Sequence, residues 1–304
     1  MQDLNALPLP DLFRELTRGE ALANLLDASL AEDLGDSGDV TTASIITPAL
    51  LGKARVVARK SGTMAGIELV THLLHRIQNP PKFAPQKTDG EPCQAGDSLG
   101  TFAGRLDRML LIERTMLNFL GRLSGIATLT KSYVAAIAGT KAVICDTRKT
   151  APGLRNLEKY AVRCGGGTLH RLGLFDAALY KDNHLSHLPL SKWKESLMRA
   201  IEKARGAHDL KFVQVEVDTL EQFQKVLSLS NGFVDMILLD NMPSETLGEA
   251  VSLRNSMRPS ILLEASGGVT LENVRTIAET GVDRISVGAL THTAPFLDVG
   301  LDLR

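Results

Sequence analysis

Residues 212–241 read FVQVEVDTLEQFQKVLSLSNGFVDMILLDN, in which two short apolar runs flank a longer amphipathic stretch. The runs at 212–215 and 236–239 have the length and composition of buried strands, and residues 220–229 carry apolar side chains at helical spacing. A strand, a helix and a second strand in this order predict a βαβ unit with parallel strands. The stretch therefore indicates an α/β fold.

The same order repeats on both sides of this stretch. Further buried strands are predicted at 142–145, 177–180, 261–263 and 285–287, and further helices at 152–162, 191–204 and 271–279. Six strands do not support a full eight-stranded barrel. The second half of the chain is therefore expected to form an incomplete α/β barrel of six or seven strands, with an open doubly wound sheet as the alternative.

The chain before this region follows a different pattern. Strands are predicted at 54–58 and 98–103, around a helix near 67–77, which indicates a separate N-terminal α+β domain. A long helix then begins at residue 106 and continues to residue 123, with apolar side chains on one or more of its faces.

Composition narrows the classes of function. The chain has 34 Lys and Arg against 35 Asp and Glu, so its net charge of −1 provides no overall attraction for nucleic acid or an anionic membrane. Cys93, Cys145 and Cys164 lack the spacing of a disulfide framework or a zinc site, and Cys145 and Cys164 are expected to be small buried side chains. No signal peptide or membrane-spanning stretch is recognisable, so we expect a cytoplasmic protein.

Three basic segments lie at predicted strand ends or loops: TRKTAPGLR (147–155), GGGTLHRLGLFD (165–176) and YKDNH (180–184). Arginine presents a fork that suits carboxylates, and lysine presents a compact charge. The segments therefore predict a site for a ligand with several negative charges, although salt bridges to acidic neighbours are the alternative for some of them. The cations concerned are Arg148, Lys149, His170, Arg171 and Lys181.

Two carboxylates lie at the ends of neighbouring predicted strands. Glu216 follows the first run of the opening stretch and Asp240 follows the second. Carboxylates at adjacent strand ends suit sugar hydroxyls or a magnesium ion that keeps much of its water. The alternative for Asp240 is that it caps the next helix.

Glycine-rich turns follow the last two predicted strands, in EASGGVTLENV (264–274) and ISVGALTH (285–292). Glycine between a strand and a helix lets backbone amides approach an anion. Because these turns match the usual phosphate position of an α/β barrel, they predict a phosphate site. The glycines at 165–167 are open to two interpretations, a flexible gate or a helix C-cap.

These motifs, together with EDLGDSGDVTT (32–42) and ERTMLNFLGRLSGIATLT (113–130), closely resemble the quinolinate phosphoribosyltransferase family. The similarity extends from Glu32 to His292, and the combination of TRKT, PGLR, GGG and KDNH is highly specific. It implies an N-terminal α/β sandwich domain at 1–125 and a barrel with the active site at 126–290. The segment 291–304 is expected to pack back on the N-terminal domain.

The resemblance also implies an activity. Members transfer a phosphoribosyl group from phosphoribosyl pyrophosphate to quinolinate with decarboxylation, giving nicotinate mononucleotide, diphosphate and carbon dioxide for NAD biosynthesis. It implies a magnesium ion, no organic cofactor, and a homodimer whose active sites are shared, without a nucleic-acid or membrane partner.

The site residues carry over by motif. Lys149, Lys181, Glu216 and Asp240 would be catalytic, with Glu216 and Asp240 holding the ribose hydroxyls and magnesium, the latter directly or through water. Arg114 would reach the quinolinate pocket from the other subunit. That pocket would also contain Arg148, Lys149, His170, Arg171 and Lys181, and the 5-phosphate would lie against Ser266, Gly267, Gly268 and Gly288, near His292. Thr168 and Leu169, directly before His170, depart from the asparagine that members often carry beside that histidine.

Three other functions are compatible with parts of the pattern. A phosphoribosyltransferase for nicotinate, or one from a molybdenum-linked operon, would keep the acids and phosphate turns but need fewer cations. A Schiff-base aldolase would use Lys181 as its nucleophile. A nucleotide sensor would bind the ligand without releasing diphosphate.

Overall fold

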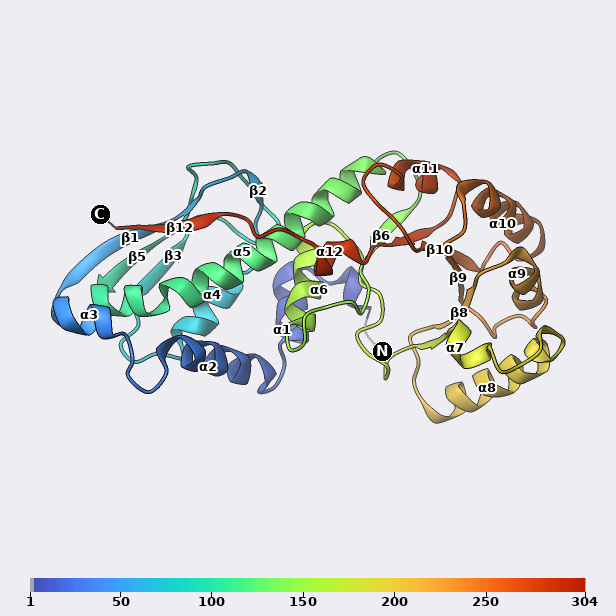
Figure 1. Ribbon diagram of the computed structural model, residues 1–304, viewed down its shortest axis with the longest axis horizontal. Helices are drawn as coiled ribbons and strands as arrows, with labels where there is room; N and C mark the ends of the chain where they lie inside the picture. The colour runs from blue at the N-terminus through green and yellow to red at the C-terminus, as the bar shows by residue number, and fades with distance from the viewer. Residues whose placement is uncertain (1–2, 304) are drawn as a thin grey trace. The chain divides into compact units, whose positions relative to one another are not determined.

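The computed structural model describes residues 3–303, which divide into two compact units (Figure 1). The parallel-sheet unit contains residues 132–149 and 167–292, together with residue 3. The antiparallel-sheet unit contains residues 4–131, 150–166 and 293–303. The sequence suggested a boundary at residue 125, whereas the division by contacts falls after Lys131, inside one long helix.

Six parallel strands form the main sheet, in the order β6-β11-β10-β9-β8-β7. From β7 to β11, each strand is next to the strand that follows it in the chain, which is the order of an α/β barrel, and β6 lies at the edge beside β11. The edge strands β6 and β7 do not pair in the described sheet, so the barrel stays open and the predicted incomplete α/β barrel is confirmed. The strands are β6 (Val143–Cys145), β7 (Ala178–Tyr180), β8 (Val213–Val217), β9 (Met236–Asp240), β10 (Leu262–Ser266) and β11 (Arg284–Ser286).

Helices alternate with these strands and lie outside the sheet (Figure 1). They are α7 (Asp182–Leu185), the 3-10 helix η2 (Leu190–Lys192), α8 (Trp193–Ala207), α9 (Leu220–Leu227), α10 (Ser244–Met257), α11 (Val274–Glu279) and α12 (Ala289–His292). The sequence did not predict α10. Its inner face contains Leu247, Ala250 and Val251 but then the buried Arg254, so a charged residue interrupts the apolar spacing.

The antiparallel-sheet unit is built on four strands in the order β12-β1-β5-β3. The predicted strands at 54–58 and 98–103 lie within β1 (Leu51–Ala58) and β5 (Ser98–Arg105). The sequence did not predict β3 (Lys82–Pro85) or β12 (Val299–Leu303), because both are edge strands without a buried residue. A two-stranded sheet pairs β2 (Gly62–Thr63) with β4 (Pro92–Cys93).

The helices of this unit include α4 and α5, which run along the four-stranded sheet (Figure 1). A buried ion pair joins α5 to α6, since Arg122 donates to the fully buried Glu158 at 2.6 Å. Glu158 also accepts a hydrogen bond from the backbone of Ala151, and Arg122 donates to the carbonyl of Ala294. The helices are η1 (Leu4–Ala6), α1 (Leu9–Leu16), α2 (Ala21–Leu34), α3 (Val40–Ile45), α4 (Ile67–Leu74), α5 (Leu106–Ala136) and α6 (Arg155–Cys164).

Two further observations concern the described residues. Cys145 and Cys164 are buried, as the sequence suggested, and so is Cys93. Between residues 3 and 303, none of the helices combines the length and apolar character that crossing a membrane requires.

Candidate active site

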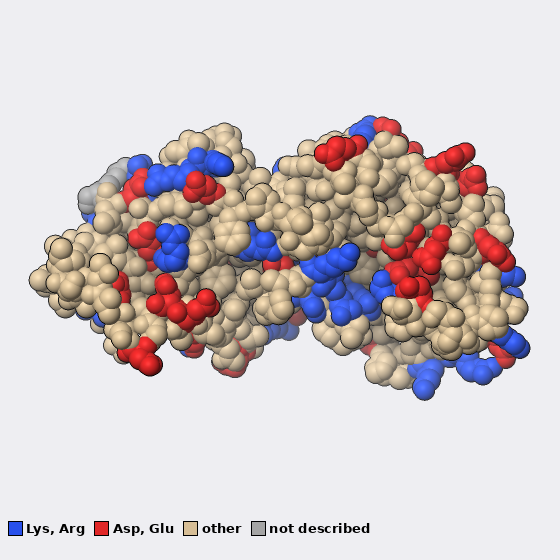
Figure 2. Space-filling model, viewed as in Figure 1, with Lys and Arg blue, Asp and Glu red and all other residues tan. Residues whose placement is uncertain are grey.

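A cavity of about 670 Å³ lies at the carboxyl ends of the strands of the parallel-sheet unit. Side chains at or just beyond the end of every strand in this sheet line it, as expected for an α/β barrel site. Basic and acidic groups lie next to each other on this unit (Figure 2). Twelve of the residues proposed from the sequence line the cavity: Arg148, Lys149, His170, Arg171, Lys181, Glu216, Asp240, Ser266, Gly267, Gly268, Gly288 and His292.

The basic part of the cavity holds cations close together. Arg171 is buried and donates to the backbone carbonyl of Ala177 at 3.2 Å. Burial lowers the pKa of Arg171, and the nearby charge of Arg148 lowers it further. Within the described part of the chain, the Nε of Arg148 is buried without a hydrogen-bond partner. An anionic ligand would offset the repulsion between Arg148 and Arg171 and could accept a hydrogen bond from the Nε of Arg148.

The acidic part contains Glu216 at β8 and Asp240 at the end of β9. Burial raises the pKa of Glu216 above its ordinary value, and the charges of Asp240 and Asp182 add to this effect, although an ion pair with Lys181 opposes it. Burial likewise raises the pKa of Asp218, again with Asp240 and Asp182 contributing. The negative charges therefore repel one another, which favours a cation or sugar hydroxyls among them.

The residues described do not form a complete metal cage. Among residues 3–303, no group of three or more His, Cys, Asp and Glu side chains is arranged to hold a metal ion. Magnesium, however, is usually bound by one or two carboxylates together with water and substrate phosphates. Glu216 and Asp240 fit this mode of binding.

The glycine turn after β10 has the backbone geometry of an anion site. Gly267 and Gly268 both have left-handed backbone angles, with φ of 92° and 59°. Two consecutive residues of this kind expose backbone amides that L side chains would obstruct. The Asn273 side chain holds the turn by donating to the Gly268 carbonyl at 2.9 Å.

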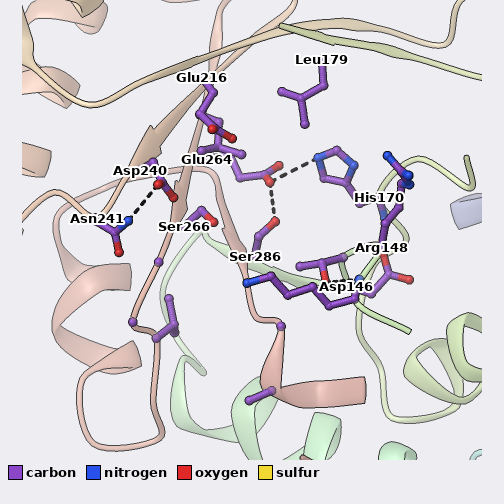
Figure 3. Close-up of a pocket in the computed structure, with 18 of the residues that line it drawn as sticks. Asp146, Arg148, His170, Leu179, Glu216, Asp240, Asn241, Glu264, Ser266 and Ser286 are labelled. Carbon is purple, nitrogen blue, oxygen red and sulfur yellow. Dashed lines mark hydrogen bonds and ion pairs between the residues drawn. The ribbon is translucent and has the colours of Figure 1, made fainter. Parts of the chain in front are cut away.

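A network of buried polar side chains forms part of the cavity wall (Figure 3). The fully buried Glu264 accepts hydrogen bonds from the Ser286 hydroxyl and, at 2.9 Å, from the Arg284 guanidinium. Its Oε1 also lies 3.3 Å from Nε2 of His170. Burial alone would raise the pKa of Glu264, but contacts with His170, Arg284 and Ser286 outweigh it and hold this pKa well below its ordinary value.

His170 is the centre of this network. Its Nδ1 accepts a hydrogen bond from the backbone of Arg171 at 2.8 Å, which assigns the ring proton to Nε2. Nε2 then donates toward the buried Gln214, 2.9 Å away, and Glu264. Both ring nitrogens therefore have protein partners, and the ring holds the backbone beside Arg171.

The sequence assigned no role to Gln214, Asn241, Glu264 or Ser286. Gln214, Glu264 and Ser286 are polar residues in or beside otherwise apolar strand runs, and that interruption was the available signal. Asn241, which lines the cavity after β9, gave no comparable signal because asparagine is common in turns.

Arg114 is the one proposed site residue that does not line this cavity. It lies on α5, in the antiparallel-sheet unit. In the single chain Arg114 is exposed. The buried face of α5 contains Ile112 and Met116, and a residue midway between them points the other way.

The chain matches known proteins along most of its length. Two family models match it, the N-terminal domain of quinolinate phosphoribosyl transferase over residues 39–124 and the C-terminal domain over residues 126–302. A carboxylating nicotinate-nucleotide pyrophosphorylase from Mycobacterium leprae is 41% identical over 286 residues, which cover 93% of this chain and 98% of the relative.

Solved structures agree with these matches. The nicotinate-nucleotide pyrophosphorylase from Francisella tularensis has a TM-score of 0.84 and 32% identity, with 100% of both chains covered. The enzyme of the same name from Ehrlichia chaffeensis has a TM-score of 0.82 and 37% identity, covering 93% of this chain and 98% of that structure.

Proposed function

The chain belongs to the quinolinate phosphoribosyltransferase family, and from this membership we propose that it makes nicotinate mononucleotide from quinolinate and phosphoribosyl pyrophosphate, for NAD biosynthesis. The observation that carries the proposal is the cavity in which a group of cations adjoins a pair of carboxylates and a glycine turn. Each part matches one part of the substrates: the pyridine carboxylates, the ribose hydroxyls and the 5-phosphate.

The chemistry needs positioning and charge rather than a protein nucleophile. The pyridine nitrogen forms a bond to the anomeric carbon while the bond from that carbon to the diphosphate oxygen breaks. The ring nitrogen is then cationic, so it accepts the electron pair left when the adjacent carboxylate leaves as carbon dioxide. A proton then replaces that carboxylate on the ring, and no organic cofactor is required.

Arg148, Arg171 and Lys181 are proposed to hold quinolinate, and Lys149 or Lys181 to assist decarboxylation by charge. Glu216 and Asp240 are proposed to hold the ribose hydroxyls and magnesium. When bound, magnesium would neutralise part of the charge on the leaving diphosphate. Ser266, Gly267, Gly268 and Gly288 are proposed to bind the 5-phosphate, with His292 beside them.

The cell compartment and assembly are also part of the proposal. The family resemblance supports a cytoplasmic homodimer with shared active sites, and the near-zero net charge supports the expectation of no nucleic-acid or membrane partner.

The direct test is diphosphate release with different pyridines. We expect rapid, magnesium-dependent release with quinolinate and far slower release with nicotinate, because the cation-rich pocket suits two carboxylates. Equal turnover of both pyridines would overturn the dicarboxylate assignment, and ligand binding without diphosphate release would indicate a nucleotide sensor. Trapping of Lys181 by borohydride in the presence of a carbonyl substrate would instead support the aldolase.

Replacing Arg171 with alanine should weaken quinolinate binding by roughly tenfold to a hundredfold, since a hydrogen bond to a charged group contributes about 1.5–3 kcal/mol. The KM for quinolinate measures this effect. Arg171→Lys keeps the charge but loses the fork, so its KM for quinolinate should lie between those of wild type and Arg171→Ala. The control Arg199→Ala removes an exposed arginine on α8 and should leave the KM for quinolinate unchanged. An unchanged KM in Arg171→Ala would contradict the role of Arg171.

A further inference from the structure

We propose that Asn241 is a positioning residue, which fixes the carboxylate of Asp240 relative to the glycine turn and so shapes the half of the cavity that takes the phosphoribosyl group. The inference rests on the proposed function and adds to it a residue that takes no part in the chemistry at the pyridine ring. Asn241 lines the cavity directly after β9 (Figure 3).

The Asn241 side chain contacts Asp240. Its Nδ2 donates to Oδ2 of Asp240 at 2.8 Å. The amide orientation follows from chemistry, because the amide oxygen would repel the carboxylate. This hydrogen bond occupies one oxygen of the carboxylate and limits its rotation, which leaves the second oxygen to face a ligand.

The same residue contacts the neighbouring strand and its turn. The backbone amide of Asn241 donates to the carbonyl of Ser266 at 2.8 Å. A Cβ atom on Gly267 would lie only 2.1 Å from Oδ1 of Asn241, so the asparagine amide fills the space that glycine leaves. One side chain therefore packs against the proposed phosphate turn while it holds the proposed ribose carboxylate.

The backbone of Asn241 is itself unusual. Its φ is 52°, and among residues 3–303 only Asn79 is another non-glycine residue with positive φ. Asparagine tolerates this conformation better than most residues, so a role as a simple turn former is the competing explanation. If Asn241 is only a turn former, glycine at this position should leave the kinetics unchanged, whereas the loss of a positioning residue should change them.

The experiment uses Asn241→Gly, which tolerates the same backbone conformation and removes the side chain with its amide. We expect the KM for phosphoribosyl pyrophosphate to rise about tenfold, as for the loss of a charge-assisted hydrogen bond. The KM for quinolinate should stay within about twofold because the basic part of the cavity is unchanged. Asn79→Gly is the matched control, since Asn79 has the same backbone angle in the other unit, and its kinetics should equal those of wild type.

Asn241→Asp provides a second measurement if the glycine variant folds poorly. Aspartate also tolerates positive φ but replaces the donor with a charge beside Asp240, so the KM for phosphoribosyl pyrophosphate should rise at least as much. Wild-type kinetics in Asn241→Gly, or equal rises in both KM values, would overturn the inference. Absence of diphosphate release by the wild-type protein would overturn the proposed function instead.

Discussion

Mixing two inactive variants, Arg114→Ala and Lys149→Ala, is expected to regenerate activity. In the proposed homodimer, Arg114 enters the partner's cavity, whereas Lys149 lines the cavity of its own chain. A mixed dimer then contains one site that lacks both side chains and one site that lacks neither. With complete exchange of an equal mixture, up to roughly a quarter of the wild-type activity should return, because a two-fold dimer has two equivalent sites.

The physical basis is the exposure of Arg114. A cation exposed on α5 of the single chain is available to an anionic ligand or to a second copy of the protein. The acid two helical turns before Arg114, Asp107, pairs with Arg105 at 2.6 Å and Arg108 at 3.4 Å.

Subunit exchange has to be demonstrated independently, for example with two differently tagged chains recovered together. If exchange occurs and no diphosphate release returns, the shared-site arrangement is wrong. Mixing Lys149→Ala with Arg171→Ala is the matched control. Both residues line the same cavity of one chain, so a mixed dimer contains one site that lacks the lysine and one site that lacks the arginine, and neither site is complete. Recovery in that pair should therefore occur only if these two side chains serve different subunits' sites, and we expect none.

Glu264→Ala is expected to lower the free energy of unfolding by about 3–5 kcal/mol, as when one partner of a buried ion pair is removed. Glu264 is fully buried and satisfies Arg284, Ser286 and the His170 ring. Without it, the Arg284 guanidinium, whose side chain is only 14% exposed, loses its carboxylate partner. The His170 ring keeps Gln214 as its acceptor but loses Glu264. Urea unfolding, followed by circular dichroism, measures the effect.

Glu264→Gln is the control, because it keeps the size and one acceptor oxygen and should cost less than alanine. The pKa of Glu264 lies below its ordinary value in the folded protein, so the ionised carboxylate stabilises the fold at neutral pH. That contribution is lost as pH falls below roughly 4, where unfolded glutamate binds a proton. The stability difference between wild type and Glu264→Gln should therefore shrink in acid. A difference that is constant with pH would contradict the assignment.

The sheet was predictable because its strands are continuous apolar runs. Strands of this kind are buried on both faces, so β8 and β9 could be recognised without knowledge of their neighbours. The edge strands β3 and β12 were not predictable, since their stability comes from pairing with β5 and β1. Such tertiary pairing leaves little trace in the local composition.

The candidate site was predictable to the extent that its residues follow strands. Arg148, Glu216 and Asp240 each lie at or after a recognisable apolar run, and a parallel sheet brings such positions to one edge. The network around Glu264 depends on distances between strands, which a single sequence does not provide. The exposure of Arg114 was not predictable either, because the sequence of an apolar helix does not tell whether it buries one face or several.

The pairing of β12 with β1 has a consequence for the order of folding during synthesis. Val56 pairs with Leu301, so the strand that completes the antiparallel sheet leaves the ribosome after the whole parallel-sheet unit. Residues 51–58 therefore have one unpaired strand edge while about 240 further residues are synthesised. At typical rates of elongation this synthesis takes about 12–48 seconds. During that interval the free edge of β1 is open to pairing with other chains, and chaperones that shield strand edges gain a defined period in which to act.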